Sequence, residues 1–258
     1  MSLTLYHNDV NSESRAVLLV CKALNIDLVL QEVDIYGEEI CGEIAKAIPY
    51  SSTPILKDDD LIIWENHAII TYLINQYRSN DPLYPNEPKK RSLIDEMMYF
   101  DSSVLLTRIN NIFNSILIKD EKEISIDNIR SLQEAYNYLE KILEKTEYLT
   151  GDTLTIADLC CVASVSSAAI IIPLSSEKYP KLFQWFAKCK KLPYYNEPTC
   201  RYPPGSKCRK RIRSTFYAIY IDIPVPIEDL HFLDCSEWFR RLPIDNLHQD
   251  FRISSRKF

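Results

Sequence analysis

The dipeptide Thr53-Pro54 is the part of the sequence with the clearest potential for chemistry. It follows a polar loop that contains Ser51 and Ser52 and opens an apolar run. We therefore expect Pro54 to be a cis proline at the first position of a strand. A cis bond would turn the main-chain N–H and C=O of Thr53 outward, where an extended peptide can pair with them. The competing interpretation is an ordinary trans proline that opens an edge strand.

Several other kinds of site are excluded by what the sequence lacks. Its four glycines are too far apart to form a phosphate-binding loop of a nucleotide-binding protein. The eight cysteines contain no C-x-x-C pair, and the four histidines are scattered without the spacing of metal ligands. We therefore expect no metal site and no redox dithiol.

Length and composition are those of a globular protein with one large domain or two small ones. The chain has 258 residues, 46% hydrophobic and 26% charged residues, and a formal net charge of −6. No secretory signal pattern opens it, so we expect a cytoplasmic protein with free thiols. The longest uncharged run, Leu159 to Ser176, contains five serines and a proline, which favours a buried core helix over a membrane span.

The first eighty residues alternate between strand and helix periodicity. The expected order is β-α-β-α-β-β-α, which is a mixed sheet with a parallel start and an antiparallel end. The predicted strands are residues 3–7, 27–34, 54–56 and 61–63, and the predicted helices are residues 13–24, 38–47 and 66–77. Asn11 and Ser12, which precede the first helix, are residue types preferred at a helix N-cap.

The second part of the chain has helical periodicity after a proline-rich linker, residues 77–88. Helices are predicted over residues 89–117, 124–146 and 179–190. A further helix should begin at Thr155, because Thr155 and Asp158 have the spacing of a capping box. The fold class is therefore α/β plus all-α: residues 1–80 form one domain, and residues 89–199 form a helical bundle.

Residues 200–258 differ from the rest of the chain. Residues 201–213 hold six basic residues and no acidic ones. A role in nuclear import or polyanion binding is one interpretation of this basic run. We favour a solvated, largely disordered tail and expect no nucleic-acid partner and no membrane association.

Residues 3 to about 199 resemble the insect delta/epsilon-type cytosolic glutathione S-transferases. The matching segments occur in the family's order: SLTLY, RAVLL-x-x-KALNI, P-x-x-x-x-P-I-L, DDD-L-I-I-W-E-N-H-A-I-I-x-Y-L, LYP-x-x-P-x-K-R, MMYFD, LTIADL, KYPKL and LPYY. The resemblance implies a thioredoxin-like N-terminal domain, a helical C-terminal domain and a homodimer. It also implies an enzyme that adds the thiol of glutathione, its co-substrate, to small hydrophobic electrophiles.

The resemblance also implies which residues bind glutathione. Its thiol would lie at the loop before the first helix, where a hydrogen-bond donor and the helix dipole favour the thiolate. Asn11 and Ser12 are the candidate donors, and the tripeptide backbone would pair with Thr53 beside Pro54. The γ-glutamyl end would contact the helix opened by Glu65, Asn66 and His67, and the glycine end would lie near Ser51 and Ser52.

The sequence departs from the family in this site. Asn11 stands where the family has a serine, and Ser12 follows one residue later. Glu13 adds a carboxylate that would raise the pKa of the thiol. Ser51 and Ser52 lie where the family has a histidine near the glycine end. These departures point to weakened or altered glutathione chemistry within the same fold.

The electrophile pocket is expected between the two domains along the first long helix. Its candidate residues are Leu105, Arg108, Ile109, Ile112 and Phe113. Arg108 could reach the tripeptide or an acidic substrate, whereas the four apolar residues have the helical spacing that is also typical of a plain core. Residues 97–100 resemble the family's dimer contact, with bundle core as the alternative.

Two other functions stay open at this point. One is a transferase-like protein, catalytically weakened, that binds hydrophobic ligands such as steroids or haem-like molecules without conjugating them. The other is an interaction protein whose basic tail docks a transferase-like scaffold onto another macromolecule.

Overall fold

The computed structural model describes residues 3–8, 11–33, 53–117, 119 and 124–195. The predicted helix over residues 38–47, the predicted glutathione contacts Ser51 and Ser52, and the tail over residues 200–258 lie outside these residues. All other elements predicted from the sequence fall within them.

A four-stranded mixed sheet forms the base of the molecule. Its strands are β1 (Thr4–His7), β2 (Val29–Glu32), β3 (Ile55–Asp58) and β4 (Leu61–Trp64), in the order β2-β1-β3-β4. β1 pairs in parallel with β2 and antiparallel with β3, and Leu5 lies between Leu30 and Leu56 in the register. The predicted parallel start and antiparallel end are confirmed.

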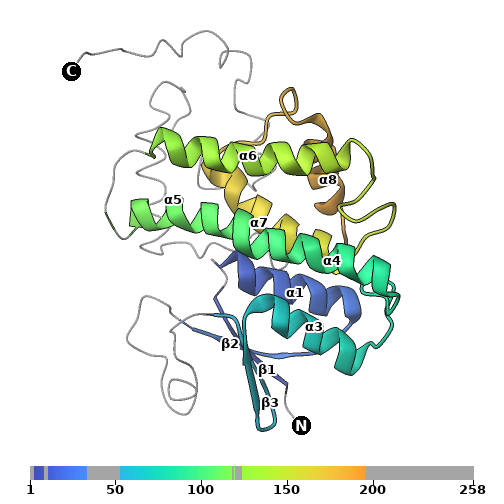
Figure 1. The fold of residues 1–258 in the computed structure, drawn as a ribbon. Coiled ribbons are helices and arrows are strands. Elements are labelled where there is room, and N and C mark those ends of the chain that lie inside the picture. The colour runs from blue at the N-terminus through green and yellow to red at the C-terminus, as the bar shows by residue number, and fades with distance from the viewer. Residues whose placement is uncertain (1–2, 9–10, 34–52, 118, 120–123, 196–258) are drawn as a thin grey trace, which may run out of the picture.

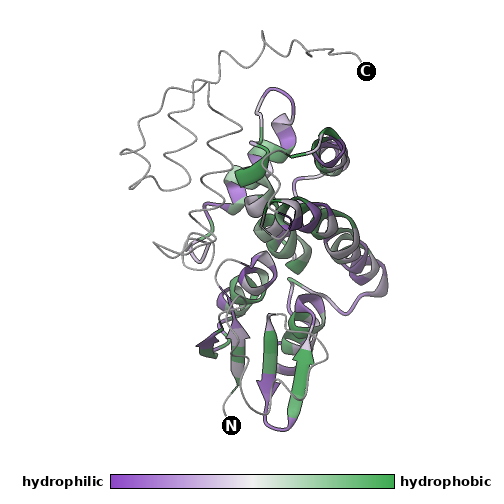
Figure 2. Ribbon diagram, turned by 90° about the vertical axis from the view of Figure 1, so that its left-hand side faces the viewer, coloured by the Kyte–Doolittle hydropathy of each residue, from purple (hydrophilic) through white to green (hydrophobic). Residues whose placement is uncertain are grey.

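Two helices lie between the sheet and the rest of the molecule, α1 (Ser12–Leu24) and α3 (Asn66–Tyr77) (Figure 1). α1 ends at Asn25, whose left-handed backbone suits asparagine at this position. Apolar stretches, green in Figure 2, run along the strands and over the helices that cover them. Leu5 and Leu56 of the sheet and the buried apolar side chains of the two helices belong to the same hydrophobic cluster as the helical part above, whereas Ile55 of β3 packs separately against Tyr6 and Ile62.

The long helix predicted over residues 89–117 is a continuous helical rod with a change of type in its middle. It consists of α4 (Pro88–Phe100), the π-helical segment η1 (Asp101–Leu106) and α5 (Thr107–Leu117). The i→i+5 hydrogen bonds of a π-helix accommodate an extra residue in the turn. Asp101, the first residue of η1, is fully buried there.

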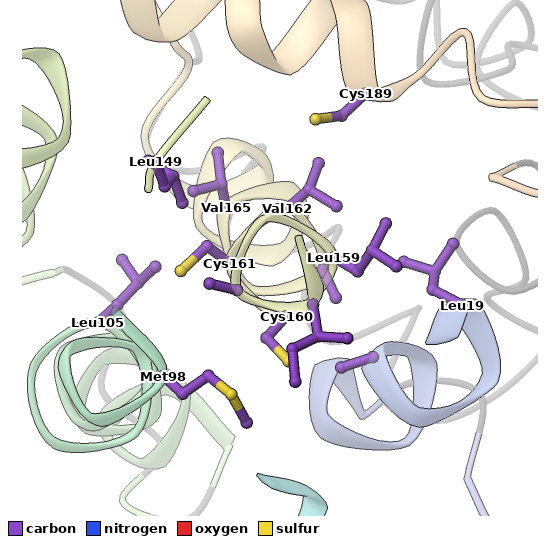
Figure 3. Packing of buried hydrophobic residues seen from close by; sticks show 14 of the residues in the cluster. Leu19, Met98, Leu105, Leu149, Leu159, Cys160, Cys161, Val162, Val165 and Cys189 are labelled. Atoms are coloured by element: carbon purple, nitrogen blue, oxygen red, sulfur yellow. The ribbon is translucent and has the colours of Figure 1, made fainter. Parts of the chain in front are cut away.

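The remaining helices are α6 (Ile126–Leu143), α7 (Ile156–Ile171) and α8 (Pro180–Cys189). α7 lies at the centre of the helical part and is buried nearly all round. Figure 3 shows its side chains surrounded by Leu19 from α1, Met98 from α4, Leu105 from η1 and Cys189 from α8. The uncharged run in the sequence is therefore a core helix, and no helix among the described residues is long and apolar enough to cross a bilayer.

The start of α7 and its contact with α1 are fixed by polar groups. The predicted capping box is present, and the main-chain N–H of Thr155 donates to Asp158 Oδ2 at 2.9 Å. Arg15 of α1, with 1% of its surface exposed, donates to the carbonyl of Ala163 and to the hydroxyls of Ser166 and Ser167. This arginine joins the two halves of the molecule across their interface.

Candidate functional site

The loop before α1 and the strand entry at Pro54 meet at one point of the sheet margin. The Thr53–Pro54 peptide bond is cis, as the sequence predicts. The side-chain amide of Asn11 donates from Nδ2 to the main-chain carbonyl of Thr53 at 2.6 Å. The predicted thiol donor and the predicted peptide-pairing residue are therefore neighbours.

Asn11 is also the N-cap of α1. Its Oδ1 accepts the main-chain N–H of Glu13 at 2.8 Å, so the capping role predicted from the residue type is confirmed. The same side chain thus fixes the start of the helix and holds the strand entry. The mouth of α1, where the helix dipole is positive, is positioned against Thr53 by this one amide.

The two serines of the first turn of α1 are buried. Ser12 is the first residue of the helix, and its side chain is largely enclosed. Ser14 accepts the main-chain N–H of Asn8 at 3.3 Å, which ties the end of β1 to the helix. Ser14 is structural, and Ser12 remains beside Asn11 as a second candidate donor.

α3 begins close to the same margin, after a residue with an unusual backbone conformation. Glu65 is exposed and has φ +71°, in the region that non-glycine residues seldom occupy and that clusters at ligand sites. Asn66, which follows it, is 4% exposed, and its Nδ2 has no hydrogen-bond partner among the described residues. Thr53 is 3% exposed, and its Oγ1 likewise has none. Polar atoms left in this way are suited to a polar ligand that supplies the missing bonds.

His67, in the first turn of α3, reaches across to the helical part. Its Nε2 lies 3.1 Å from Oδ2 of Asp101, the residue that opens η1. The other carboxylate oxygen, Oδ1, is buried and has no hydrogen-bond partner among the described residues. Sequence reasoning missed Asp101 as a site residue. The available signal was an acidic residue inside the apolar run MMYFD, because a buried carboxylate needs a partner.

Glu13 lies in the first turn of α1 among other acidic groups. The pKa of this carboxyl is raised from 4.5 to about 7, mainly by burial and to a smaller extent by the charges of Asp101 and Glu65. A hydrogen bond from the Asn11 side chain and the charge of His67 act in the opposite direction and lower it. The site therefore holds a carboxyl group that changes charge close to neutral pH.

Most of the apolar residues predicted to line the electrophile pocket lie in the hydrophobic core. Leu105, Ile109 and Ile112 are fully buried in the main hydrophobic cluster, as the core alternative predicts, and only Phe113 is half-buried at its edge. The Arg108 side chain contacts α6. It donates to the carbonyl of Ser131 at 2.5 Å and pairs with Glu134 at 3.4 Å, both on α6. These contacts do not support the expectation that Arg108 reaches the tripeptide.

The residues predicted for the dimer contact also fall into two groups, one packed inside the bundle and one exposed. Met97 and Met98 are buried in the bundle core, and Phe100 stacks on Tyr138 with ring centroids 4.6 Å apart. Tyr99, in contrast, is 73% exposed, and Leu93 lies exposed on the same helix. Only the outward part of α4 is therefore available to a partner.

A separate hollow of about 550 Å³ lies at the opposite ends of α1 and α3. Its lining includes Asn25 after α1, Arg78 after α3 and the first residues of β2. The Arg78 guanidinium donates to the carbonyls of Leu24 and Asn25, so it is used in closing the end of α1. Within the described residues, no group of His, Cys, Asp and Glu side chains is arranged to hold a metal ion.

Comparison with known proteins gives a consistent result. Residues 106–193 match the family described as "Glutathione S-transferase, C-terminal domain". Glutathione S-transferase 1 of Manduca sexta is 34% identical over 217 residues, which cover 83% of this chain and 99% of that protein.

Solved structures agree with the sequence comparison. An epsilon-class glutathione S-transferase from the housefly Musca domestica superposes with a TM-score of 0.76 and 33% identity, covering 84% of this chain and 98% of that one. A glutathione transferase homologue from Drosophila mojavensis, solved with bound glutathione, gives a TM-score of 0.75 and 31% identity, with 84% and 97% covered. The resemblance to the insect enzymes and the expected fold class are confirmed.

Proposed function

The chain belongs to the glutathione S-transferase family, and from that premise we propose that it conjugates the thiol of glutathione to small hydrophobic electrophiles. The observation that carries the proposal is the meeting of Thr53 with the N-terminus of α1, joined by the Asn11 amide at 2.6 Å. A peptide that pairs with Thr53 brings its cysteine to the positive end of a helix, where the thiolate is favoured.

The γ-glutamyl end of the tripeptide fits the start of α3. Its carboxylate can accept hydrogen bonds from the first main-chain N–H groups of the helix and from Nδ2 of Asn66, which has no partner among the described residues. Its ammonium group suits the acidic side chains of Glu65 and Asp101; Oδ1 of Asp101 has no partner in the part of the chain that the structure describes. We propose Asn66, Glu65 and His67 as glutathione-binding residues on these grounds, with Asp101 added to them.

Asn11 is the residue we assign to the sulfur. An asparagine amide has two N–H donors: this one holds Thr53 O and is also hydrogen-bonded to the Glu13 carboxyl, with which a sulfur would share it. A hydrogen bond from this amide stabilises a thiolate as a serine hydroxyl would, while Ser12 provides a second hydroxyl at the helix start. The predicted contact of the glycine end with Ser51 and Ser52 lies outside the described residues.

We also propose a cytoplasmic homodimer in which the exposed face of α4 meets a second copy. Leu93 and Tyr99 are large hydrophobic residues exposed on that helix, and such patches mark interaction sites. The division of the chain into a glutathione-binding domain over residues 1–80, a helical domain over residues 89–199 and a separate tail over residues 200–258 is part of the same proposal.

Retention on immobilised glutathione and turnover of a chloronitrobenzene substrate test the conjugation function. We expect the protein to be retained and to give a rate that depends on glutathione. The double variant Asn11→Ala, Ser12→Ala should lose most of this rate, whereas Arg130→Ala, at an exposed position of α6, should not. An unchanged rate in the double variant would remove both residues as thiol donors.

A second function is favoured by one observation. The Asn11 side chain hydrogen-bonds both Thr53 and the Glu13 carboxyl, so it is less available to a sulfur than the family's serine would be. A protein that binds hydrophobic ligands such as steroids without conjugating them would tolerate this arrangement. Tight steroid binding with no glutathione-dependent rate for a series of electrophiles would establish this function in place of the first.

A further inference from the structure

We infer that Glu13 is the general base that takes the proton from the thiol of glutathione. The inference rests on the proposed function, since it assigns a residue to the same reaction. From the sequence alone, the Glu13 carboxylate is expected to disfavour the thiolate; in this inference it helps to form it.

The position of Glu13 is fixed by the residue that also holds the peptide-pairing edge. Its main-chain N–H donates to Asn11 Oδ1 at 2.8 Å, and Asn11 Nδ2 donates to Thr53 O at 2.6 Å. The Glu13 carboxyl group is itself hydrogen-bonded to the Asn11 side chain, which holds Thr53 O, so a cysteine that pairs with Thr53 is presented on the side of this carboxyl. A catalytic base must lie within hydrogen-bond reach of its proton, and we assign Glu13 to this position because it shares Asn11 with the pairing edge.

The surroundings of Glu13 favour its protonated form. Asp101 faces it from η1 and Glu65 from the residue before α3, and Arg15 on the same helix is turned away to α7. His67 on α3 and the Asn11 side chain act in the opposite direction but do not outweigh the burial. Burial and the two carboxylates raise the pKa of Glu13 to about 7. A carboxylate with the ordinary pKa of 4.5 is a weak base, whereas one with a pKa near 7 is a stronger base of which about half is still ionised at neutral pH.

Charge balance explains why this carboxylate does not oppose the thiolate. A Glu13 that stayed ionised beside the sulfur would place a second negative charge there and raise the pKa of the thiol. A Glu13 that accepts the proton becomes neutral as the sulfur becomes negative. The net charge of the site is then the same before and after the transfer, so no extra repulsion develops.

The reaction is balanced without any further reagent. The S–H bond breaks and its proton passes to the Glu13 carboxylate. The sulfur's electron pair forms the new C–S bond to the electrophilic carbon, and the leaving group, such as chloride, departs with its own pair. Glu13 then releases the proton to water when the product leaves.

The substitution Glu13→Gln tests the inference, because it keeps the size of the side chain and removes the base. We measure kcat/KM with glutathione and a chloronitrobenzene over a range of about pH 5 to pH 9. In the unsubstituted protein the rate should rise with a midpoint near pH 7, the pKa of Glu13. In Glu13→Gln the rate at neutral pH should fall by about 100-fold or more, and the midpoint should move to the pKa of the thiol, about 8.5.

Control variants separate this role from a structural one. Glu13→Asp keeps a carboxylate on a shorter side chain and should restore part of the rate. Glu144→Gln, at an exposed carboxylate at the end of α6, should leave the profile unchanged. Calorimetric binding of S-methylglutathione, which has no thiol proton, should be within about threefold of the unsubstituted protein in all three variants.

Two results would overturn the inference while the proposed function stands. A faster Glu13→Gln with a lower midpoint would show that Glu13 only repels the thiolate. An unchanged profile would show that it takes no part in the reaction. An unsubstituted protein that neither binds S-methylglutathione nor conjugates any electrophile would instead overturn the proposed function, and the assignment of Glu13 with it.

Discussion

Nδ2 of Asn11 lies 2.6 Å from the main-chain oxygen of Thr53, across forty-two positions of sequence. The bond joins the loop ahead of α1 to the residue before the cis proline. Since Oδ1 of the same side chain caps α1, one amide sets both the helix start and the strand entry. Glutathione chemistry at this margin therefore depends on a residue that also has a structural function.

Replacement of Asn11 should affect stability and turnover together. Asn11→Ala removes the N-cap bond and the bond to Thr53, each worth about 1 kcal/mol, so we expect a loss of about 2 kcal/mol in the free energy of unfolding. Urea unfolding followed by circular dichroism gives this value. Asn11→Asp keeps the capping oxygen but lacks the N–H donor, so it should lose about half as much. Equal losses in both variants would contradict the assignment of two separate bonds.

The raised pKa of Glu13 should make stability depend on pH. Because the folded chain holds this proton up to about pH 7 and the unfolded chain only to about 4.5, the folded state binds more protons within that window. Stability then falls as the pH rises through the window and stays at the lower level above it. The full effect is at most about 3 kcal/mol.

Glu13→Gln removes this cost, so it should stabilise the protein at about pH 8 and have little effect at about pH 5. Urea unfolding of both proteins at the two pH values measures the difference. Glu144→Gln serves as the exposed control and should show no such dependence. A gain for Glu13→Gln that is equal at both pH values would contradict the raised pKa.

Replacement of Arg15 should lower the free energy of unfolding more than replacement of most other residues. Its truncation to alanine removes the buried donor to the Ser167 hydroxyl and one of the donors to the Ala163 carbonyl, which also accepts from Ser166, at a cost of about 2 to 3 kcal/mol. Arg15→Lys keeps the charge but cannot reach all the acceptors, so it should lose less than Arg15→Ala. Arg130→Ala, exposed on α6, is the matched control with an expected change below about 0.5 kcal/mol.

The contact between His67 and Asp101 should make the effects of replacing the two residues on the free energy of unfolding non-additive. His67→Ala leaves a fully buried carboxylate with no partner among the described residues, so it should cost about 1 to 3 kcal/mol. The double variant His67→Ala, Asp101→Ala should lose less than the sum of the two single variants. A double-mutant cycle in urea unfolding measures the coupling. Additive losses would mean that the two side chains contribute independently.

The described cysteines should be unreactive in the folded protein. Burial raises the pKa of Cys21 to about 12 and raises the pKa values of Cys160, Cys161 and Cys189 well above the ordinary range, which removes the reactive thiolate. Labelling with iodoacetamide, followed by mass spectrometry of the peptides, should modify these four only after denaturation. Fast modification of Cys160 or Cys161 in the native protein would contradict their place at the centre of the core.

Most of the fold was predictable because its signals are local. The alternation of Leu3, Leu5 and His7, the capping spacing of Thr155 and Asp158, and the proline after a polar loop each depend on neighbouring residues. The corresponding elements are confirmed, including the helix over residues 66–77 with the same bounds.

The candidate site was predicted less completely, because its groups are joined over long distances. Nothing local indicates that Asp101 opens a π-helical turn and faces His67, or that Arg108 is taken up by Ser131 on α6. The raised pKa of Glu13 was not predictable either, because the burial that causes it depends on packing against other elements.

The π-helical turn η1 has a consequence for how the long rod is oriented. An α-helix advances about 100° per residue, so one surplus residue in the turn rotates everything beyond it by roughly that angle. The direction of the exposed face of α4, which carries Tyr99, therefore does not determine the direction of the buried face of α5 as it would in one regular α-helix. Deletion of Ser103 would make α4 and α5 one regular α-helix, and it would rotate the side chains of α5 away from their present neighbours. The extra residue therefore separates the rotational setting of the exposed surface of α4 from that of the buried face of α5.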